Sequence, residues 1–423
     1  MIAVVGLGFV GLTTALGLAK QTGRLVYAYD SNDSLREQLC RGEVPFHEPE
    51  LGAALLELLG SGLIIGETLE AAVRHADIVF YCVGTPSRPD GGANLDALTA
   101  AIVETLPLLK EGGRRTLVIK STVPPMTTTG VVKPLLESSG HIVGDTVGLA
   151  HNPEFLREGR AWQDFIHPDR IVIGACDKLS EEQLKRLYEP FGAPMQGVSP
   201  ATAEFAKLAS NALLATMISF SNELAELAEV TPEIDIPQAF RLLHADGRWQ
   251  GGGMAGYVYP GCGFGGYCLP KDALSLQHYS REIGRESALI GEVLAVNARA
   301  KLAFAKRVAA AAGSHGRLAV LGLAFKPGSD DVRGTPAADI IAHLLELGLT
   351  DIVAYDPLAM PRFREAYDFP IRYAGTLREA LDGRDSAALV TAWPEFSCQQ
   401  ELLERVKVID GRYGLGKREA ARV

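Results

Sequence analysis

The first twenty residues constrain the fold of this chain more than any other stretch. An apolar run at residues 2–5 is followed at once by Gly6, Gly8 and Gly11, and then by a segment at residues 12–20 with helical spacing. In a strand–turn–helix unit the first glycine allows a tight turn and the second lets the backbone approach a pyrophosphate. The third glycine lets the helix pack closely on the strand. The pattern predicts the dinucleotide-binding turn of a doubly wound α/β domain.

An acidic residue after the second apolar run indicates which dinucleotide is bound. Asp30 follows the run at residues 25–29. A carboxylate there accepts hydrogen bonds from a ribose 2′-hydroxyl and repels a 2′-phosphate, so NAD is predicted over NADP. The alternative is a doubly wound fold that has lost its cofactor. The candidate cofactor residues of this region are Gly8, Phe9, Val10, Gly11 and Asp30.

The order of apolar and helical segments predicts the fold class. In the first half, helical segments alternate with short apolar runs, which are typical of buried parallel strands. These runs lie at residues 2–5, 25–29, 78–83, 117–119 and 171–173. A second pattern of this kind places strands at residues 318–322 and 351–355 around a helix at residues 336–347. Two doubly wound, Rossmann-like α/β domains are therefore expected.

The middle of the chain has a different texture. Residues 203–229 are alanine-rich and predict one helix much longer than usual for a globular protein. Glycine is dense at residues 247–266, and helical spacing resumes from residue 270 to about residue 312. We expect domains at residues 1–199, 200–312 and 313–423, with a long central helix and a helical middle segment between the two α/β domains.

Net charge and cysteine content exclude several classes of protein. The 423 residues include 41 lysines and arginines against 51 aspartates and glutamates, a formal charge of −10. Such a surface repels a nucleic-acid backbone or an anionic membrane, so neither is an expected partner. The six cysteines form neither a C-x-x-C pair nor a group of zinc-finger type. We expect no structural metal and a reducing, cytoplasmic compartment.

Residues 261–272 (GCGFGGYCLPKD) carry the densest chemical signal. Pro270 suits the first turn of a helix and disfavours helical geometry in the residue before it, so Cys268 is expected just before a helix N-terminus. The helix dipole and the Lys271 charge would both lower the pKa of the thiol, which favours a thiolate nucleophile. The alternative is a buried, inert cysteine. We assign that role to Cys262, which no helix start follows.

Two carboxylates occur in residues 152–158 (NPEFLRE). With Asn152 as N-cap and Pro153 as the first helical residue, a helical turn would place Glu154 and Glu158 on one face. The alternative is that these acidic residues only complement a helix dipole.

Two polar residues interrupt the long central helix. Lys207 and Asn211 are four residues apart, and therefore share one face of it. A lysine embedded in an apolar element needs a partner or a ligand. The competing interpretation is that the two residues form a structural pair on the helix. The sequence alone does not distinguish such a pair from a ligand-binding site.

The loop after the first strand of the second α/β pattern also carries cations. Residues 322–333 lack the three-glycine spacing, so a second complete dinucleotide site is not expected there. Lys326 and Arg333 are suited to phosphate contact. The alternative is an ion pair with Asp330 or Asp331.

Taken together, these motifs point to a known family. They are residues 6–11, 83–86, 121–125, 152–158, 207 with 211, 265–272 and 322–333. In this order they resemble the nucleotide-sugar 6-dehydrogenase family, most closely the UDP-glucose 6-dehydrogenases, over essentially the whole chain. The resemblance implies an NAD domain, a central helix that mediates a homodimer, and a nucleotide-sugar domain. It also implies oxidation of the C6 alcohol of UDP-glucose to the carboxylate of UDP-glucuronate with two NAD⁺.

The resemblance further implies a covalent route. The first oxidation would give an aldehyde that the Cys268 thiolate captures as a thiohemiacetal, and the second would leave a thioester. Lys207 and Asn211 would stabilise the developing oxyanion, for which an ammonium group and an amide donor are suited.

Hydrolysis of the thioester needs a positioned water. The resemblance assigns that water to Thr122, Glu154 and Asp272. Glu154 is the expected base, because a carboxyl group in a closed, partly apolar site can have its pKa raised toward neutrality.

Further contacts follow from the resemblance alone. The additional cofactor contacts are Thr85, Thr122, Glu158, Lys271 and Arg333. The substrate contacts are Glu154, Phe155, Leu156, Glu158, Lys207, Asn211, Tyr259, Phe264, Gly265, Gly266, Lys326 and Arg412, with Arg248 as an arginine donated across the dimer. The chain departs from the family pattern at Met217, where an arginine is common, and at Glu50, where a glycine is usual.

Several alternatives remain open. GDP-mannose 6-dehydrogenase shares the cysteine and the 152–158 segment, whereas dehydrogenases of N-acetylated sugars depart from that segment after its first glutamate. A two-electron 3-hydroxyacid dehydrogenase shares the glycine motif and the lysine–asparagine pair, but needs neither Cys268 nor a third domain. A non-catalytic NAD-sensing module would tolerate the loss of Cys268.

Overall fold

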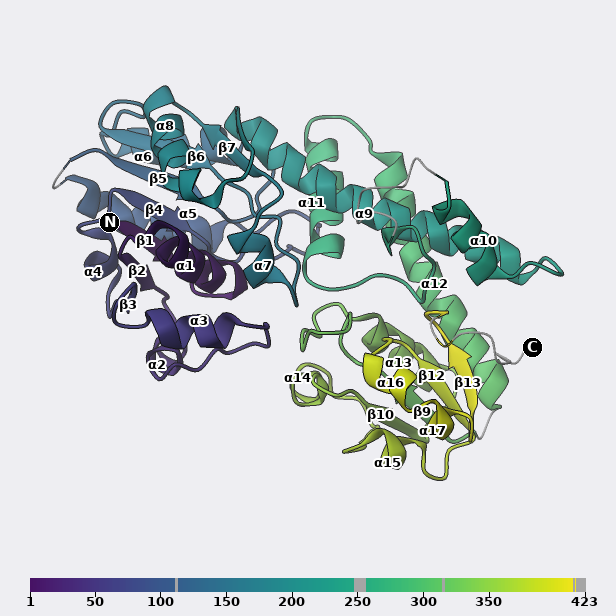
Figure 1. Cartoon of the computed structure of the whole chain (residues 1–423). Coiled ribbons are helices and arrows are strands. Elements are labelled where there is room, and N and C mark those ends of the chain that lie inside the picture. The colour runs from purple at the N-terminus through teal and green to yellow at the C-terminus, as the bar shows by residue number, and fades with distance from the viewer. Residues whose placement is uncertain (111–112, 247–255, 314–315, 414, 416–423) are drawn as a thin grey trace. The chain divides into compact units, whose positions relative to one another are not determined.

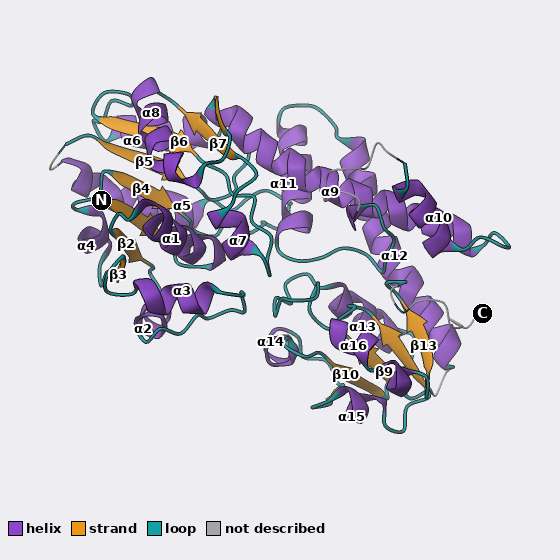
Figure 2. Cartoon of the chain, viewed as in Figure 1, coloured by secondary structure: helices purple, strands orange, loops and turns teal. Residues whose placement is uncertain are grey.

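The computed structural model describes residues 1–110, 113–246, 256–313, 316–413 and 415 (Figure 1). They fall into two compact units. Unit 1 is Met1–Ser210 with Leu274–Ile283, and unit 2 is Asn211–Ala273 with Gly284–Val423. Each unit contains one sheet flanked by helices (Figure 2). No helix in the described residues is long and apolar enough to cross a membrane.

The sheet of unit 1 has the strand order β3-β2-β1-β4-β5-β6-β7-β8. The strands are β1 (Ile2–Val5), β2 (Val26–Tyr29), β3 (Leu63–Ile65), β4 (Ile78–Tyr81), β5 (Arg115–Ile119), β6 (Val147–His151), β7 (Ile171–Ala175) and β8 (Met195–Val198). The order from β3 to β6 is that of a dinucleotide-binding fold. All five runs predicted in this half form strands, whereas the sequence pattern missed β3, β6 and β8.

One direction was predicted wrongly. The run at residues 171–173 was expected to be a strand in a parallel sheet, but β7 pairs antiparallel with β6 and parallel only with β8. A strand buried on both faces has the same apolar sequence whichever way it points, so the pattern carries no information on direction.

Helices cover both faces of the unit 1 sheet because successive strand residues point to opposite sides. Ile2 and Val4 join a cluster with α1, α3, α7 and α8, while Ala3 and Val5 join one with α4, α5 and α6. These helices, with α2 between α1 and α3 in the chain, are α1 (Phe9–Thr22), α2 (Asp33–Cys40), α3 (Leu51–Leu58), α4 (Leu69–Val73), α5 (Asp96–Thr105), α6 (Lys133–Ser138), α7 (Ala161–Ile166) and α8 (Lys178–Tyr188).

The sheet of unit 2 is entirely parallel, in the order β11-β10-β9-β12-β13. Its strands are β9 (Leu318–Leu321), β10 (Ile352–Tyr355), β11 (Arg372–Tyr373), β12 (Ser386–Leu389) and β13 (Lys407–Asp410). Its flanking helices are α13 (Pro336–Glu346), α14 (Met360–Ala366), α15 (Leu377–Leu381), α16 (Pro394–Cys398) and α17 (Gln400–Leu403). The α/β class with two doubly wound, Rossmann-like sheets is confirmed.

Within the described residues, four helices form the middle of the chain, which was predicted to be helical, and three of them are long. The four are α9 (Pro200–Glu229), α10 (Ile236–His244), α11 (Cys268–Glu282) and α12 (Ala288–Ala312). The helical stretch expected from residue 270 to about 312 is divided between α11 and α12. The division falls at Gly284, whose φ of +67° is a left-handed conformation that ends a helix.

Glu50, the departure from a usual glycine, precedes α3 with a φ of +67°. Side chains with a Cβ rarely adopt this conformation, which explains why glycine suits the position. The Glu50 carboxylate accepts a hydrogen bond from Gln163 Nε2 at 2.8 Å.

Candidate active site

The glycine turn after β1 leaves its backbone accessible. Gly6 has a φ of +91°, and a Cβ on Gly11 would overlap the Gly6 carbonyl, so α1 can start this close to the strand only with glycine there. A Cβ on Gly8 would meet no atom within 4 Å. Phe9 and Val10 begin α1 directly after it. The turn therefore presents a helix N-terminus beside open space, which suits a phosphate group.

Asp30, at the end of β2, faces this turn. Its Oδ2 accepts a hydrogen bond from Leu7 N at 2.7 Å, and its Oδ1 accepts one from Asn32 N at 2.9 Å. The carboxylate is half-buried, and each of its oxygens has capacity for a further donor. A ribose hydroxyl can therefore still bind to it.

The loops that follow β4 and β5 are joined to each other. Thr85 Oγ1 donates to Thr122 O at 2.7 Å, and Ser121 Oγ donates to Val83 O at 2.7 Å. Thr85 is buried and Thr122 half-buried. Both candidate threonines thus lie on the carboxyl edge of the unit 1 sheet, where ligands bind in doubly wound folds.

Glu154 and Lys207 form a buried ion pair in unit 1. Glu154 Oε1 lies 2.9 Å from Lys207 Nζ, and Oε2 accepts a hydrogen bond from Leu156 N at 2.6 Å. Burial raises the pKa of Glu154, but the Lys207 ammonium and the Leu156 N–H outweigh it, so the net pKa lies below the ordinary value. The expectation of a raised pKa was therefore wrong, because Lys207 supplies an opposite charge in contact with the carboxylate.

The helical turn expected at residues 152–158 was also wrong. This segment is irregular, and Asn152 caps no helix. Its Oδ1 instead accepts hydrogen bonds from Tyr188 Oη at 2.6 Å and Lys120 Nζ at 3.0 Å. A side chain already bound in this way is not available to cap a helix. Glu154 and Glu158 are therefore not neighbours on a helix face.

A cleft of about 280 Å³ in unit 1 is lined by Lys120 and by residues 152–157, among others. Phe155 lines it and lies near two cations: the Arg170 guanidinium is 4.1 Å from the ring centroid and Lys207 Nζ is 5.4 Å from it. The candidate residues Glu154, Phe155 and Leu156 therefore share one cleft. Its lining combines cations, three carboxylates and several aromatic rings, which suits a polar ligand.

In unit 2, Cys268 is exposed and is the first residue of α11. The thiol therefore lies at a helix N-terminus, one residue inside the predicted position. Cys262 is fully buried, and burial raises the pKa of its thiol, which agrees with the structural role assigned to it.

The glycine-rich loop before Cys268 is held by backbone contacts. A Cβ on Gly265 would overlap Gly334 O, and Gly266 has a φ of +81° beside the Phe325 ring. Phe264 is buried, and its N and O bond with the side-chain amide of Asn297 at 2.7 and 3.1 Å. The loop conformation therefore depends on glycine and on one asparagine of α12.

Asp272 is the centre of polar contacts in the first turn of α11. Its Oδ2 accepts a hydrogen bond from Asn211 Nδ2 at 2.5 Å, and its Oδ1 lies 2.6 Å from Lys271 Nζ. All three residues are buried. Lys271 is thus neutralised by an adjacent carboxylate, which reduces the field that we expected it to exert on the Cys268 thiol.

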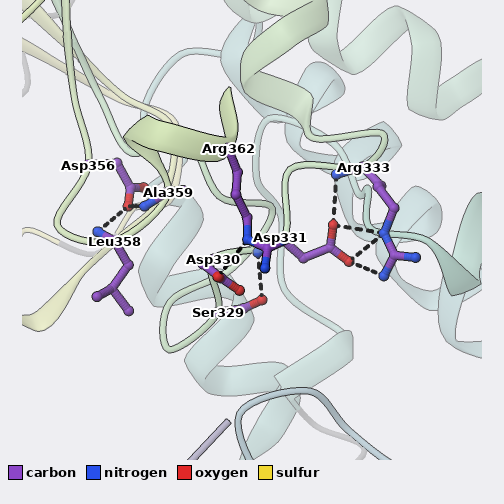
Figure 3. Close-up of polar contacts among 8 residues, drawn as sticks. All are labelled: Ser329, Asp330, Asp331, Arg333, Asp356, Leu358, Ala359 and Arg362. Carbon is purple, nitrogen blue, oxygen red and sulfur yellow. Dashed lines mark hydrogen bonds and ion pairs between the residues drawn. The ribbon is translucent and has the colours of Figure 1, made fainter. Parts of the chain in front are cut away.

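Arg333, one of the two candidate cations of the 322–333 loop, has protein partners (Figure 3). Arg333 binds both carboxylate oxygens of Asp331, and its guanidinium lies 4.3 Å from the Tyr267 ring centroid. Asp330 pairs with Arg362 of α14 at 2.7 Å. The ion-pair alternative therefore holds for Arg333. A phosphate would have to share its guanidinium with Asp331.

Three further candidates lie in unit 2. Lys326 is half-buried, with its Nζ 5.4 Å from the Phe325 ring centroid. Arg412 Nε donates to Val390 O at 2.5 Å. Tyr259 is half-buried, and its hydroxyl donates to Tyr413 O at 3.4 Å.

Comparison with known proteins decides the family. Models of the UDP-glucose/GDP-mannose dehydrogenase family match the NAD binding domain at residues 1–192, the central domain at residues 201–299 and the UDP binding domain at residues 319–417. The chain belongs to this family. It is therefore an NAD-dependent nucleotide-sugar dehydrogenase by descent, as the sequence motifs predicted.

Individual relatives cover nearly the whole chain. The UDP-glucose 6-dehydrogenase AglM of Haloferax volcanii is 35% identical, over 99% of this chain and 98% of its own length. A UDP-glucose dehydrogenase structure from Pyrobaculum islandicum is 38% identical with a TM-score of 0.90, covering 97% of this chain and 94% of its own. A UDP-D-ManNAc dehydrogenase structure from Pyrococcus horikoshii is 27% identical with a TM-score of 0.85, covering 99% and 96%.

Two positions singled out by the family resemblance, Arg248 and Met217, are not among the site residues described above. Arg248, the candidate for an arginine donated across a dimer, lies outside the described residues. Met217, where the family commonly has an arginine, packs against the apolar cluster of Ala225, Ile236, Phe240 and Val258. The position therefore serves packing in this chain.

Sequence reasoning missed residues that hold this family site in place. Lys120 precedes the 121–125 motif by one residue and is buried, and Asn297 fixes the backbone of Phe264 from the alanine-rich α12. Both are polar residues in apolar surroundings, which is the signal that singled out Lys207. The same criterion applied along the whole chain would have found them.

Proposed function

We propose that this chain is a UDP-glucose 6-dehydrogenase that oxidises the C6 alcohol to the carboxylate of UDP-glucuronate through a thioester on Cys268. Family membership supports the substrate, as do the two relatives named as UDP-glucose dehydrogenases, at 35% and 38% identity. The observation that carries the covalent route is the exposed thiol at the first residue of α11. A thiol at a helix N-terminus is placed to react as the thiolate.

The residues of unit 1 fit NAD. The open space at Gly8, the close start of α1 at Gly11 and the Asp30 carboxylate suit a pyrophosphate and a ribose. Thr85, Thr122, Glu158, Lys271 and Arg333 are the further proposed contacts. NAD⁺, when bound, accepts one hydride in each of two oxidations.

The covalent steps follow from the chemistry of the side chains. The Cys268 thiolate attacks the C6 aldehyde carbon to form the oxyanion of a thiohemiacetal, and loss of a hydride from that carbon in the second oxidation leaves a thioester. Lys207 and Asn211 stabilise the oxyanion. Each is already fixed by a carboxylate, Glu154 and Asp272 respectively, so little reorganisation is needed.

Hydrolysis of the thioester releases the acid and regenerates the thiol. Thr122 and Asp272 orient the water, whose oxygen adds to the thioester carbon, and Glu154 accepts its proton. The lowered pKa of Glu154 keeps it ionised at neutral pH, and so in the form that accepts a proton. Water supplies the second oxygen of the carboxylate.

We place the nucleotide-sugar against the remaining candidates. Phe155, Leu156 and Glu158 are the proposed sugar contacts. Tyr259, Phe264, Gly265, Gly266, Lys326 and Arg412 are the proposed contacts of the nucleotide and diphosphate.

The direct test uses Cys268→Ser. Binding of UDP-glucose, measured by calorimetry, should be nearly unchanged, while formation of UDP-glucuronate should be lost. Unchanged turnover in this variant would rule out the covalent route. Cys398→Ser, at another exposed cysteine, is the matched control and should have full activity.

A second test concerns Glu154. In Glu154→Gln the thioester should form but hydrolyse slowly, so mass spectrometry during turnover should detect an adduct on Cys268. An unmodified protein with normal turnover would remove Glu154 from the role of base.

The substrate and the number of electrons are tested together. UDP-glucose should give two NADH per molecule. Turnover with GDP-mannose and none with UDP-glucose would instead assign the GDP-mannose activity. One NADH per substrate would favour a two-electron hydroxyacid dehydrogenase.

A homodimer through residues 200–312 is proposed from the surface of α9. Leu213, Phe220 and Leu227 are 51%, 51% and 60% exposed and are spaced by seven residues, so they form one apolar stripe. Phe220→Glu should convert the protein to a monomer in light scattering, and a dimer that survives this change would exclude the stripe as the interface. A reducing compartment such as the cytoplasm would keep the Cys268 thiol reduced.

A further inference from the structure

Lys120 is a buried cation that the proposed mechanism does not yet use. It follows β5 directly and is 4% exposed. Its Nζ lies 3.0 Å from Asn152 Oδ1 and 3.3 Å from Asn152 O, with the Phe165 ring centroid at 5.9 Å. Burying an ammonium group is costly, so its presence beside the cleft calls for a function.

Asn152, the partner of Lys120, is held from several elements. Its Nδ2 donates to Val172 O in β7 at 2.7 Å, and its backbone N donates to Ile119 O at 2.9 Å. Tyr188, the last residue of α8, donates to its Oδ1 at 2.6 Å. Lys120 thus completes a set of contacts that fixes one residue between β5, β7 and α8.

The fixed residue lies two positions before Glu154. Pro153 between them has a restricted φ, so the position of Asn152 limits where the Glu154 backbone can lie. The far side of Glu154 is held by Leu156 N and Lys207. The carboxylate is therefore located from both directions, and Lys120 contributes to one of them.

Lys120 also acts on Glu154 through its charge. The titratable groups of this cluster are Cys82, His151, Glu154, Tyr188 and Lys207. Burial raises the pKa of Cys82 to about 12, and burial together with Lys120 lowers that of His151 to about 3, so both are neutral at pH 7. Burial lowers the pKa of Lys120 to about 8, which leaves it mostly charged at pH 7. Glu154 therefore interacts with the charges of two ammonium groups, those of Lys207 and Lys120.

We propose that Lys120 is a positioning residue for thioester hydrolysis: through Asn152 it holds the segment that carries Glu154, and its charge adds to the larger effect of Lys207 in favouring the ionised Glu154 carboxylate. The inference rests on the proposed function, in which Glu154 is the base. It assigns a specific step to Lys120, because capture of the aldehyde by Cys268 does not need Glu154 as a base.

The test measures thioester hydrolysis against pH in Lys120→Met. Loss of the charge should slow hydrolysis about tenfold and let the Cys268 adduct accumulate in mass spectrometry. Removing a cation raises the pKa of a neighbouring carboxyl group. The acidic limb of the hydrolysis profile should therefore move to higher pH, by roughly half a unit to one unit. The first hydride transfer, followed in a single turnover, should change less than threefold.

Two variants separate charge from packing. Tyr188→Phe removes the other donor to Asn152 Oδ1 but no charge, so it should slow hydrolysis without moving the acidic limb. Lys20→Met, on the exposed face of α1, is the matched control and should leave both rate and profile unchanged. If Lys120→Met does not fold, Lys120→Gln, which keeps a donor and loses the charge, carries the same test.

The possible outcomes separate the two proposals. If the wild-type enzyme forms no Cys268 adduct and Glu154→Gln behaves as wild type, the proposed function fails. If both behave as proposed but the acidic limb of the folded Lys120 variant does not move, the role of Lys120 is wrong. If the acidic limb moves as far in Tyr188→Phe as in Lys120→Met, the charge of Lys120 does not cause the movement.

Discussion

The chain contains two glycine turns with nearly the same backbone and different uses. Gly6 after β1 and Gly322 after β9 both have a φ of +91°. The N–H of each donates at 2.8 Å to the last residue of the neighbouring strand, Tyr29 in one case and Tyr355 in the other. An aspartate follows that residue in both units. Strand, turn and acid therefore recur, although only one of the two turns belongs to an expected NAD site.

The carboxylates distinguish the two turns. Asp356 is fully buried and accepts hydrogen bonds from Leu323 N, Ala324 N, Leu358 N, Ala359 N and Trp393 Nε1, at 2.7 to 3.0 Å (Figure 3 shows the contacts to Leu358 and Ala359). Asp30 is half-buried and accepts from Leu7 and Asn32. Five donors exceed the four acceptor sites of a carboxylate, whereas two leave sites free. An acid at this position predicts a ribose site only if its oxygens remain available.

The largest effect is expected for Asp356→Ala. Five donors, most of them buried, would lose their acceptor, which should destabilise the sheet of unit 2 by about 3 kcal/mol. Native-state hydrogen exchange measures each unit separately. The amides of β9 and β10 should exchange roughly a hundredfold faster, and those of β1 and β2 should not change. Equal acceleration in both sheets would show that Asp356 does not act locally.

Asp30→Ala is the matched change in unit 1, and its effect should be on binding. The KM for NAD⁺ should rise about tenfold or more, because a hydrogen bond to a charged acceptor is lost, and that for NADP⁺ should fall as repulsion is relieved. Exchange in β1 and β2 should accelerate less than fivefold. Strong destabilisation of the unit 1 sheet with an unchanged KM would mean that Asp30, like Asp356, has a structural role and does not bind the cofactor.

This contrast shows what sequence reasoning could reach. Periodicity and the glycine spacing predicted both sheets, and the motifs predicted the family. Short motifs could not predict which side chains contact each other when they are distant in sequence. Asn152 was expected to cap a helix, but its side-chain oxygen accepts a hydrogen bond from Lys120 instead. The pKa of Glu154 was expected to be raised, but Lys207 forms an ion pair with this carboxylate. Both lysines are distant in sequence from the residues that they contact. Direction in β7 was missed because burial on both faces leaves no periodic signal.

The smallest effect is expected for Trp393→Phe, which removes one of the five donors to Asp356. The other four remain, so β9 and β10 should lose about 1 kcal/mol of stability, a third of the Asp356→Ala effect. Part of that loss would come from the smaller ring of this buried side chain rather than from the hydrogen bond. The double variant separates the two terms. If the bond matters, Trp393→Phe should cost less in the Asp356→Ala background than alone, because its acceptor is already gone. If Trp393→Phe lowers the stability equally in both backgrounds, Trp393 contributes only by packing. The four backbone donors then account for the stabilising hydrogen bonds to Asp356.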